Sequence, residues 1–146
     1  MLALIQRVSR AQVTVDEALV GAIGPGLLAL VGVEPGDSPA QTRRLAQRLL
    51  GYRVFADEQG RMNRSLADTG GGLLLVSQFT LAADTSSGMR PGFSTAAAPA
   101  EAEQAFNELV AICRQLHAPG VETGRFGAHM VVDLVNDGPV TFLLRP

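Results

Sequence analysis

The sequence predicts a single α/β domain. Two uninterrupted apolar runs, Leu27–Val33 and Leu73–Val76, lie between turn residues and predict strands that are buried on both faces. Two segments with apolar residues at helical spacing, beginning at Ser38-Pro39 and at Pro99, predict helices. Because the 146 residues contain no internal repeat and no linker, we expect one domain with a sizeable core.

The N-terminal region predicts a ribbon of strands. Apolar and polar residues alternate over Leu2–Val8 and over Gln12–Val15, which predicts two strands separated by Ser9-Arg10. Ala18–Ile23 predicts a further strand after a turn at Asp16-Glu17.

Punctuating residues set the bounds of the later elements. Ser38 is suited to cap the first helix and Gly51 to end it, while Pro119-Gly120 ends the second. Asp137-Gly138-Pro139 predicts a tight hairpin turn between the last two strands. The shorter predicted strands are Tyr52–Ala56, Val121–Phe126, His129–Asn136 and Val140–Leu144.

The composition excludes several classes of function. A net charge of −2 argues against coating DNA or RNA by bulk electrostatics, and no apolar run approaches the roughly 20 residues of a membrane span. All twelve cationic side chains are arginines, which removes lysine nucleophiles and Schiff bases. A single cysteine and an N-terminus unlike a signal peptide predict a cytoplasmic protein, with neither DNA nor a membrane as partner.

The leading candidate for a site is the end of the strand at Leu73–Val76. Ser77, Gln78 and Thr80 follow it, with Phe79 between them, and polar groups at the end of a buried strand need partners. The polar loop Ala82–Phe93 comes next and contains Arg90, a side chain suited to phosphate or carboxylate.

Common catalytic patterns are absent. Nothing in the sequence ties His117 or His129 to Ser77, and Ser77 does not lie in a G-x-S-x-G elbow, so a Ser-His-Asp triad is disfavoured. The hydroxyls could instead merely cap a strand end. Two histidines and one cysteine show no ligand spacing, and no phosphate-binding glycine motif occurs, so we expect neither a metal nor a cofactor.

Four stretches together carry a family resemblance. They are LIQRVSRAQVTVD at 4–16, SQFTL at 77–81, GMRPGF at 88–93 and GRFGAHMVVDLVNDGPVTF at 124–142. On these the chain resembles the D-aminoacyl-tRNA deacylases from end to end. It departs from the family pattern at Gly92, where a serine is expected, and at His129, where an acidic or polar residue is expected.

The resemblance implies a fold and an activity. The fold is one deacylase domain over residues 1–146, with mostly antiparallel, barrel-like sheets and two main helices packed on them. The activity is hydrolysis of the ester that joins a D-amino acid to the terminal adenosine of tRNA, with mischarged glycyl-tRNA as a further substrate. The enzyme would be a homodimer whose Gly138-Pro139 pair, held in cis, completes the partner's site and excludes L-amino acids.

The resemblance also assigns roles to residues. Backbone N–H groups of Phe79 and Thr80 would stabilise the oxyanion, while Ser77 and Gln78 would hold the adenosine or the ester. The ribose 2′-hydroxyl would assist attack by water.

Further residues are candidates for tRNA contacts. Phe126 and Met130 are candidates for packing against adenine, and Arg7 and Arg90 for phosphate contacts. Two alternatives remain open: a dimeric module that binds RNA ends without turnover, and an esterase that uses Thr80 directly as nucleophile.

Overall fold

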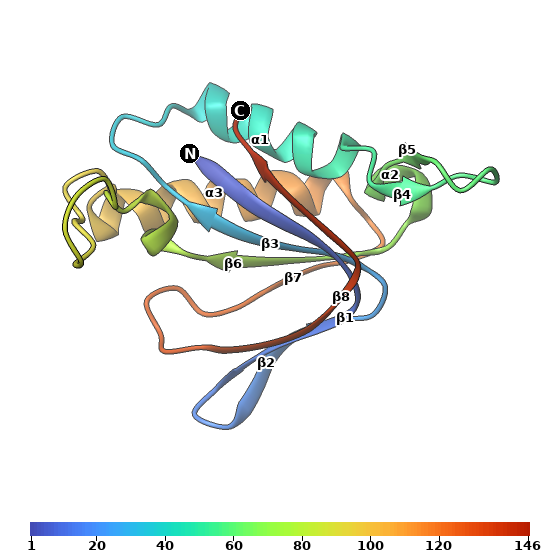
Figure 1. Ribbon diagram of the computed structural model, residues 1–146, viewed down its shortest axis with the longest axis horizontal. Helices are drawn as coiled ribbons and strands as arrows, with labels where there is room; N and C mark the ends of the chain where they lie inside the picture. The colour runs from blue at the N-terminus through green and yellow to red at the C-terminus, as the bar shows by residue number, and fades with distance from the viewer.

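A six-stranded sheet forms the centre of the molecule in the computed structural model, which describes residues 1–146 (Figure 1). The strands are β1 (Leu2–Val15), β2 (Ala18–Ile23), β3 (Gly26–Gly32), β4 (Phe55–Ala56), β5 (Met62–Arg64), β6 (Gly72–Ser77), β7 (Val121–Thr123) and β8 (Val131–Leu144). The helices are α1 (Pro39–Gly51), α2 (Leu66–Thr69), the 3₁₀ turn η1 (Phe79–Ala82) and α3 (Pro99–Leu116).

Strand β1 is the organising strand because it pairs antiparallel with β2, β3 and β8. The order continues from β3 to β6 to β7 through parallel pairs. Figure 1 shows α1 and α3 on one side of the sheet, while β2, β7 and part of β8 curl away on the other. The predicted fold class, one α/β domain with a barrel-like, mostly antiparallel sheet and two main helices, is confirmed.

The sheet has apolar residues on both faces, as the two apolar runs predict. Leu27 and Leu73 belong to a cluster of 24 buried residues between the sheet and the helices. Leu28 and Leu74 belong to a second cluster of 6 buried residues inside the curl of the sheet. Adjacent residues of a strand point to opposite faces, so β3 and β6 serve both cores. No helix combines the length and apolar composition needed to cross a bilayer.

The prediction of two strands separated by Ser9-Arg10 is wrong, because β1 continues through that point. Its first half pairs with β3 up to Val8, and its second half pairs with β2 from Ala11. The polar pair therefore marks an exchange of partner strands, with an irregularity in the β8 register at the same place.

The predicted hairpin turn at Asp137-Gly138-Pro139 is also wrong. Strand β8 is continuous, and both of its halves pair with β1 in the same antiparallel sense. Asn136 is opposite Val8 and Thr141 is opposite Gln6, so four residues of β8 bulge out opposite one residue of β1. A bulge tolerates proline because its residues do not contribute to the hydrogen-bonded ladder. The Gly138-Pro139 peptide bond is cis.

The capping residues in the sequence predict the bounds of α1 correctly. Several shorter elements differ from their predicted bounds. Ser38 and Gln41 form a complete capping box at the start of α1, and Gly51 is its last residue. Residues 52–56 hold only the two-residue strand β4, and the predicted strand at 121–126 ends at Thr123. At the end of α3, His117 is buried and its imidazole donates to the Gly71 carbonyl at 2.7 Å.

Candidate active site

The site begins where β6 leaves the sheet. Ser77 is still opposite Val31 of β3, and the Gln78 N–H donates to the Val31 carbonyl at 2.7 Å. The chain then turns into η1, which starts at Phe79. This turn carries Gln78 and Phe79 out of the core to the C-terminal end of a parallel pair of strands, where open α/β sheets place ligands.

A cavity of about 410 Å³ opens beside this strand end. Ser77, Gln78 and Phe79 form one wall, and the segment that carries Phe126 and Met130 forms another. Five residues named by the sequence for one site thus line one cavity. The remaining lining residues are Val76, Ala97, Pro99, Ala102, Gly127, Ala128, His129 and Val132.

The wall formed by Ala97, Pro99 and Ala102 was not predicted. The Ala97 N–H donates to the Val33 carbonyl at 3.0 Å, which ties the segment before α3 to the end of β3. Small apolar residues at a helix start carry no chemical signal, so only the three-dimensional packing brings them to the site.

Thr80 lies next to this cavity and does not line it. Its Oγ1 accepts a hydrogen bond from Nε2 of Gln78, so the two polar side chains hold each other. The backbone N–H groups of Phe79 and Thr80 donate no hydrogen bond within the chain, and Gln78 makes no side-chain cap to η1. Two adjacent backbone donors at the strand end are therefore free to bind a ligand.

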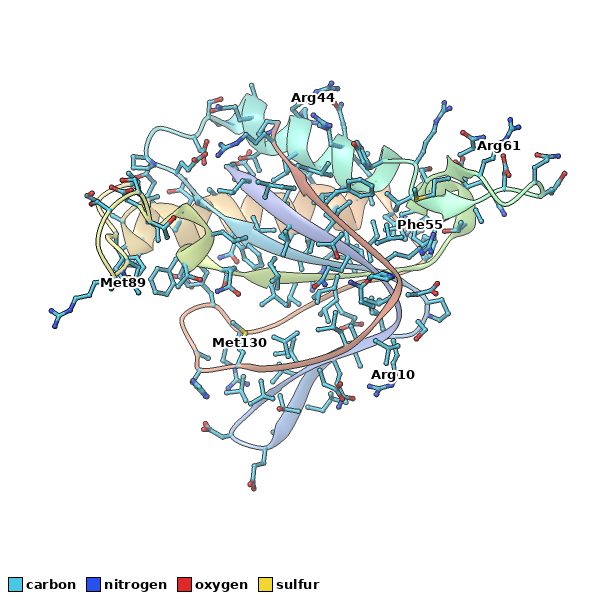
Figure 2. All side chains as sticks on the ribbon, viewed as in Figure 1. Arg10, Arg44, Phe55, Arg61, Met89 and Met130 are labelled. Atoms are coloured by element: carbon cyan, nitrogen blue, oxygen red, sulfur yellow. The ribbon has the colours of Figure 1, made fainter.

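The aromatic residues at the site are held by neighbours. The Phe126 ring packs against Phe106 of α3 with 6.2 Å between centroids, and Phe79 packs against Phe93 with 5.1 Å. Met130 Sδ accepts a hydrogen bond from the Arg125 N–H at 3.4 Å. Figure 2 shows Met130 on the segment between β7 and β8, below the end of β6.

Arg90 lies on the loop that follows η1 and does not line the cavity. Two backbone hydrogen bonds between Asp84 and Gly92, at 2.8 and 2.9 Å, close this loop. Its exposed tip includes Met89, which Figure 2 labels on this loop.

Arg7 binds protein groups around the β8 bulge. Its Nε donates to the Asp137 carbonyl at 3.0 Å, and its Nη1 donates to the Val54 carbonyl at 2.7 Å. The side chain is 17% exposed and also faces the Asp137 carboxylate at 3.5 Å. Any phosphate contact by Arg7 would compete with these bonds.

Gly138-Pro139 does not line this cavity in the same chain. Arg7, opposite the bulge, is level with Leu27 and Leu73, whereas Ser77 is four residues further along β6. At about 3.3 Å per residue this is about 13 Å along the strands, in addition to the three strand spacings of about 4.8 Å each that separate β8 from β6.

The electrostatics of the cavity are simple. His129 is the only lining residue with a titratable side chain, and it is exposed. No group of three or more His, Cys, Asp or Glu residues is placed to hold a metal ion. The chemical resources of the site are therefore hydrogen-bond donors, apolar and aromatic surface, and one imidazole.

Comparison with known proteins identifies the family. The model of the family described as D-Tyr-tRNA(Tyr) deacylase matches residues 4–145. The chain belongs to this deacylase family. Membership makes the protein a hydrolase of ester bonds, and the resemblance stated from the sequence is confirmed.

Relatives at high identity support the assignment over the full length. A D-aminoacyl-tRNA deacylase of Xanthomonas axonopodis pv. citri (strain 306) is 83% identical, and one of Stenotrophomonas maltophilia (strain K279a) is 80% identical. Each alignment covers 100% of both chains.

Solved structures of the same fold are also similar. A structure titled c-Myc DNA Unwinding Element Binding Protein matches with a TM-score of 0.95 and 37% identity, covering 100% of this chain and 99% of that one. A structure of a probable eukaryotic D-amino acid tRNA deacylase shares the fold, with a TM-score of 0.84 at 15% identity over 98% and 97% of the two chains.

Proposed function

We propose that this deacylase hydrolyses the ester between a D-amino acid and the 3′-terminal adenosine of tRNA. The observation that carries the proposal is one cavity that unites Ser77–Phe79 with Phe126 and Met130, beside two free backbone N–H groups. The apolar walls suit a nucleobase, and the polar strand end suits an ester. We place the reaction in the cytoplasm, where translation consumes aminoacyl-tRNA.

The free N–H groups of Phe79 and Thr80 are the proposed oxyanion donors. Attack on the ester carbonyl moves negative charge onto its oxygen, and fixed donors bind that charge more tightly than the neutral carbonyl. Removing one such donor in a hydrolase typically costs about 10²–10³ in kcat. Ser77 and Gln78 would orient the adenosine or the ester by hydrogen bonds.

We propose that the substrate itself, rather than a protein side chain, assists removal of the proton from the attacking water. Apart from His129, no lining side chain can act as a general base at neutral pH. The ribose 2′-hydroxyl is adjacent to the 3′-ester, and we propose that it assists the attacking water. The protein then contributes mainly position and oxyanion binding.

Selection of the D-amino acid requires a second subunit in this proposal. Gly138-Pro139 lies far from the cavity of its own chain, so it can contribute only to the site of another copy. Strand β8 supports a homodimer because its exposed side chains include Val131, Val135 and Leu143, with 59%, 41% and 55% of their surface accessible. Backbone from the partner subunit would then collide with an L side chain and leave room for a D side chain.

Glycyl-tRNA follows as a further substrate from the same geometry. Glycine has no side chain to collide with the Gly138-Pro139 backbone, so exclusion by steric clash would not reject it. The reaction would thus remove D-amino acids and mischarged glycine from tRNA, which is a proofreading role.

The decisive experiment compares D-tyrosyl-tRNA with L-tyrosyl-tRNA. Purified protein at micromolar concentration should release D-tyrosine and spare the L-form. Absence of D-selective release would refute the proposal, and equal binding of both tRNAs without hydrolysis would establish the RNA-binding alternative.

Thr80→Val separates the two hydrolytic mechanisms. If the Thr80 hydroxyl only positions Gln78, the variant should keep turnover within about ten-fold. Loss of turnover with intact tRNA binding would instead support Thr80 as the nucleophile.

A further inference from the structure

The arginines of this acidic protein are unevenly distributed. Residues 43–64 contain six arginines and only two acids, Asp57 and Glu58, for a net charge of +4. The rest of the chain contains six arginines and twelve acids, for a net charge of −6. The basic face, as we name it, consists of Arg43, Arg44, Arg48, Arg53, Arg61 and Arg64.

The fold presents these side chains on one side of the molecule. Helix α1 buries Leu45, Ala46 and Leu49 against the core, which leaves its arginines facing outward. Figure 2 shows Arg44 on α1 and Arg61 on the β4–β5 hairpin extending from the same side of the body.

The basic face is not neutralised by ion pairs. None of its six arginines forms a salt bridge; the arginines that do are Arg7, Arg10 and Arg145. Arg48 lies over the Tyr52 ring, and Arg64 donates to the Asp68 carbonyl at 3.3 Å. The nearby Asp57 carboxylate accepts hydrogen bonds from Gln59, Arg61 and Asn63 within its own turn.

These guanidinium groups have no carboxylate partner and are spread along one surface. Such an arrangement fits a polyphosphate backbone. Arginine binds phosphate through two parallel N–H donors, and α1 alone extends for about 20 Å, enough to follow several successive phosphates. Asp57 and Glu58 interrupt the face at the hairpin, and Asp68 lies beside it: besides hydrogen bonds from Ser65, the charges of Arg64 and Arg53 lower the pKa of the Asp68 carboxyl.

The basic face adjoins the segment that completes the site. Arg53 precedes Val54, whose carbonyl accepts from Arg7, and Arg7 also holds the Asp137 carbonyl. The face therefore begins beside the Gly138-Pro139 bulge of its own chain. In the proposed homodimer that bulge enters the partner's cavity, so the basic face of one subunit borders the cavity of the other.

We infer that the basic face binds backbone phosphates of the tRNA acceptor stem while the 3′ end occupies the partner subunit's cavity. This inference rests on the proposed function. Phosphate contacts carry no base information, so one face serves many tRNAs.

The test removes charge from the face and compares two substrates. The variants are R43Q/R44Q, R61Q/R64Q and the combined four-residue variant, with R10Q as the control for one exposed arginine outside the face. The substrates are D-tyrosyl-tRNA and the D-tyrosyl ester of adenosine, which has no stem. We expect kcat/KM of the combined variant to fall at least ten-fold on tRNA at low salt and to remain within two-fold on the short ester.

Salt dependence supplies a second readout. The slope of log kcat/KM against log salt concentration should become less negative by about one for each phosphate contact removed. Unchanged tRNA hydrolysis with an unchanged slope would overturn the inference. Failure of the wild type on both substrates would overturn the proposed function instead, and charge-dependent binding to anionic vesicles without a change in tRNA hydrolysis would assign the face to membranes.

Mixed dimers test whether the basic face of one subunit serves its own cavity or that of its partner. Ala102→Trp in one subunit should fill its cavity, so that only the other cavity works. With the four arginine substitutions in the subunit whose cavity is open, tRNA hydrolysis should persist. With both sets of changes in the same subunit it should fall. The reverse pattern, or equal activity of the two dimers, would contradict binding across the interface.

Discussion

Cys113 is on α3, and its side chain lies in the hydrophobic core with none of its surface accessible. Burial raises the pKa of its thiol to about 12, because water no longer stabilises the thiolate. At neutral pH the native protein should therefore resist thiol reagents, since the thiolate is the reactive form. Labelling by a chromogenic disulfide should appear only after denaturation. Rapid labelling of the folded protein would contradict this burial.

Glu34 gives stability a pH dependence. A hydrogen bond from the α-ammonium group of Met1, at 2.7 Å, lowers the pKa of Glu34 below its ordinary value of 4.5, and Arg145 adds to the effect. A lowered pKa in the folded state stabilises the protein above pH 4.5, and the stabilisation disappears as pH falls through the folded-state pKa.

Glu34→Gln tests this linkage. The variant should lower the Tm by a few degrees at pH 7 and by much less at an acidic pH below the folded-state pKa of Glu34, where both proteins are uncharged at this position. Glu58→Gln, in an exposed loop, is the matched control. Equal Tm differences at both pH values would exclude Glu34 as the source.

Residue-level signals in the sequence were reliable where the chemistry is local. Ser38 and Gln41 cap α1 through their own backbone, so spacing alone located the helix start. Ser77, Gln78 and Phe79 were found because polar residues directly follow a buried strand. Ala97 and Ala102 also line the cavity, but alanine has no chemical signature and only tertiary packing places it there.

At the level of elements, the closeness of β3 and β6 depends on glycine. A Cβ at Gly26 would lie 1.9 Å from the Gly72 carbonyl oxygen, a backbone atom that cannot move without disturbing the parallel pair. Gly26→Ala should therefore lower stability by several kcal/mol, through backbone displacement in a packed core. Urea unfolding measures the effect. Gly24→Ala is the control, because no atom lies within 4 Å of its Cβ position, and comparable losses would contradict the explanation.

The conformation of the bulge in β8 depends on hydrogen bonds from Arg7. Arg7→Gln shortens the side chain and removes the donors to the Asp137 and Val54 carbonyls. We expect the preference for D- over L-tyrosyl-tRNA to fall at least ten-fold, because the backbone that we propose excludes L-amino acids is no longer held. Hydrolysis of both substrates under single-turnover conditions measures the ratio, with R10Q as the control. An unchanged ratio would separate Arg7 from stereochemical selection.

Element boundaries failed where they depend on distant partners. Ser9-Arg10 and Gly138-Pro139 both suggest the end of a strand. At each place the regular pairing is in fact interrupted, but the strand continues beyond it. Strand β1 bridges both places, since its halves pair with different strands on one side and with β8 along the other. A pairing between residues more than a hundred positions apart leaves no local pattern to detect.

For the whole molecule, the exposed apolar residues of β8 predict self-association. Val135→Glu places a charge among side chains that the proposed dimer would bury. Sedimentation should show a monomer of 15.3 kDa for the variant and twice that mass for the wild type. Deacylation should fall with the dimer, since each site would lose its completing segment. A monomeric, fully active wild type would refute the shared site.

The bulge in β8 also fixes the length of the chain at this place. Beyond it, Leu144 is 2% exposed in the core while Leu143 is 55% exposed. Because strand faces alternate at every residue, one residue inserted after Pro139 would exchange the two and expose the core position. Insertions and deletions are therefore confined to the loops that neither β1 nor β8 holds in register.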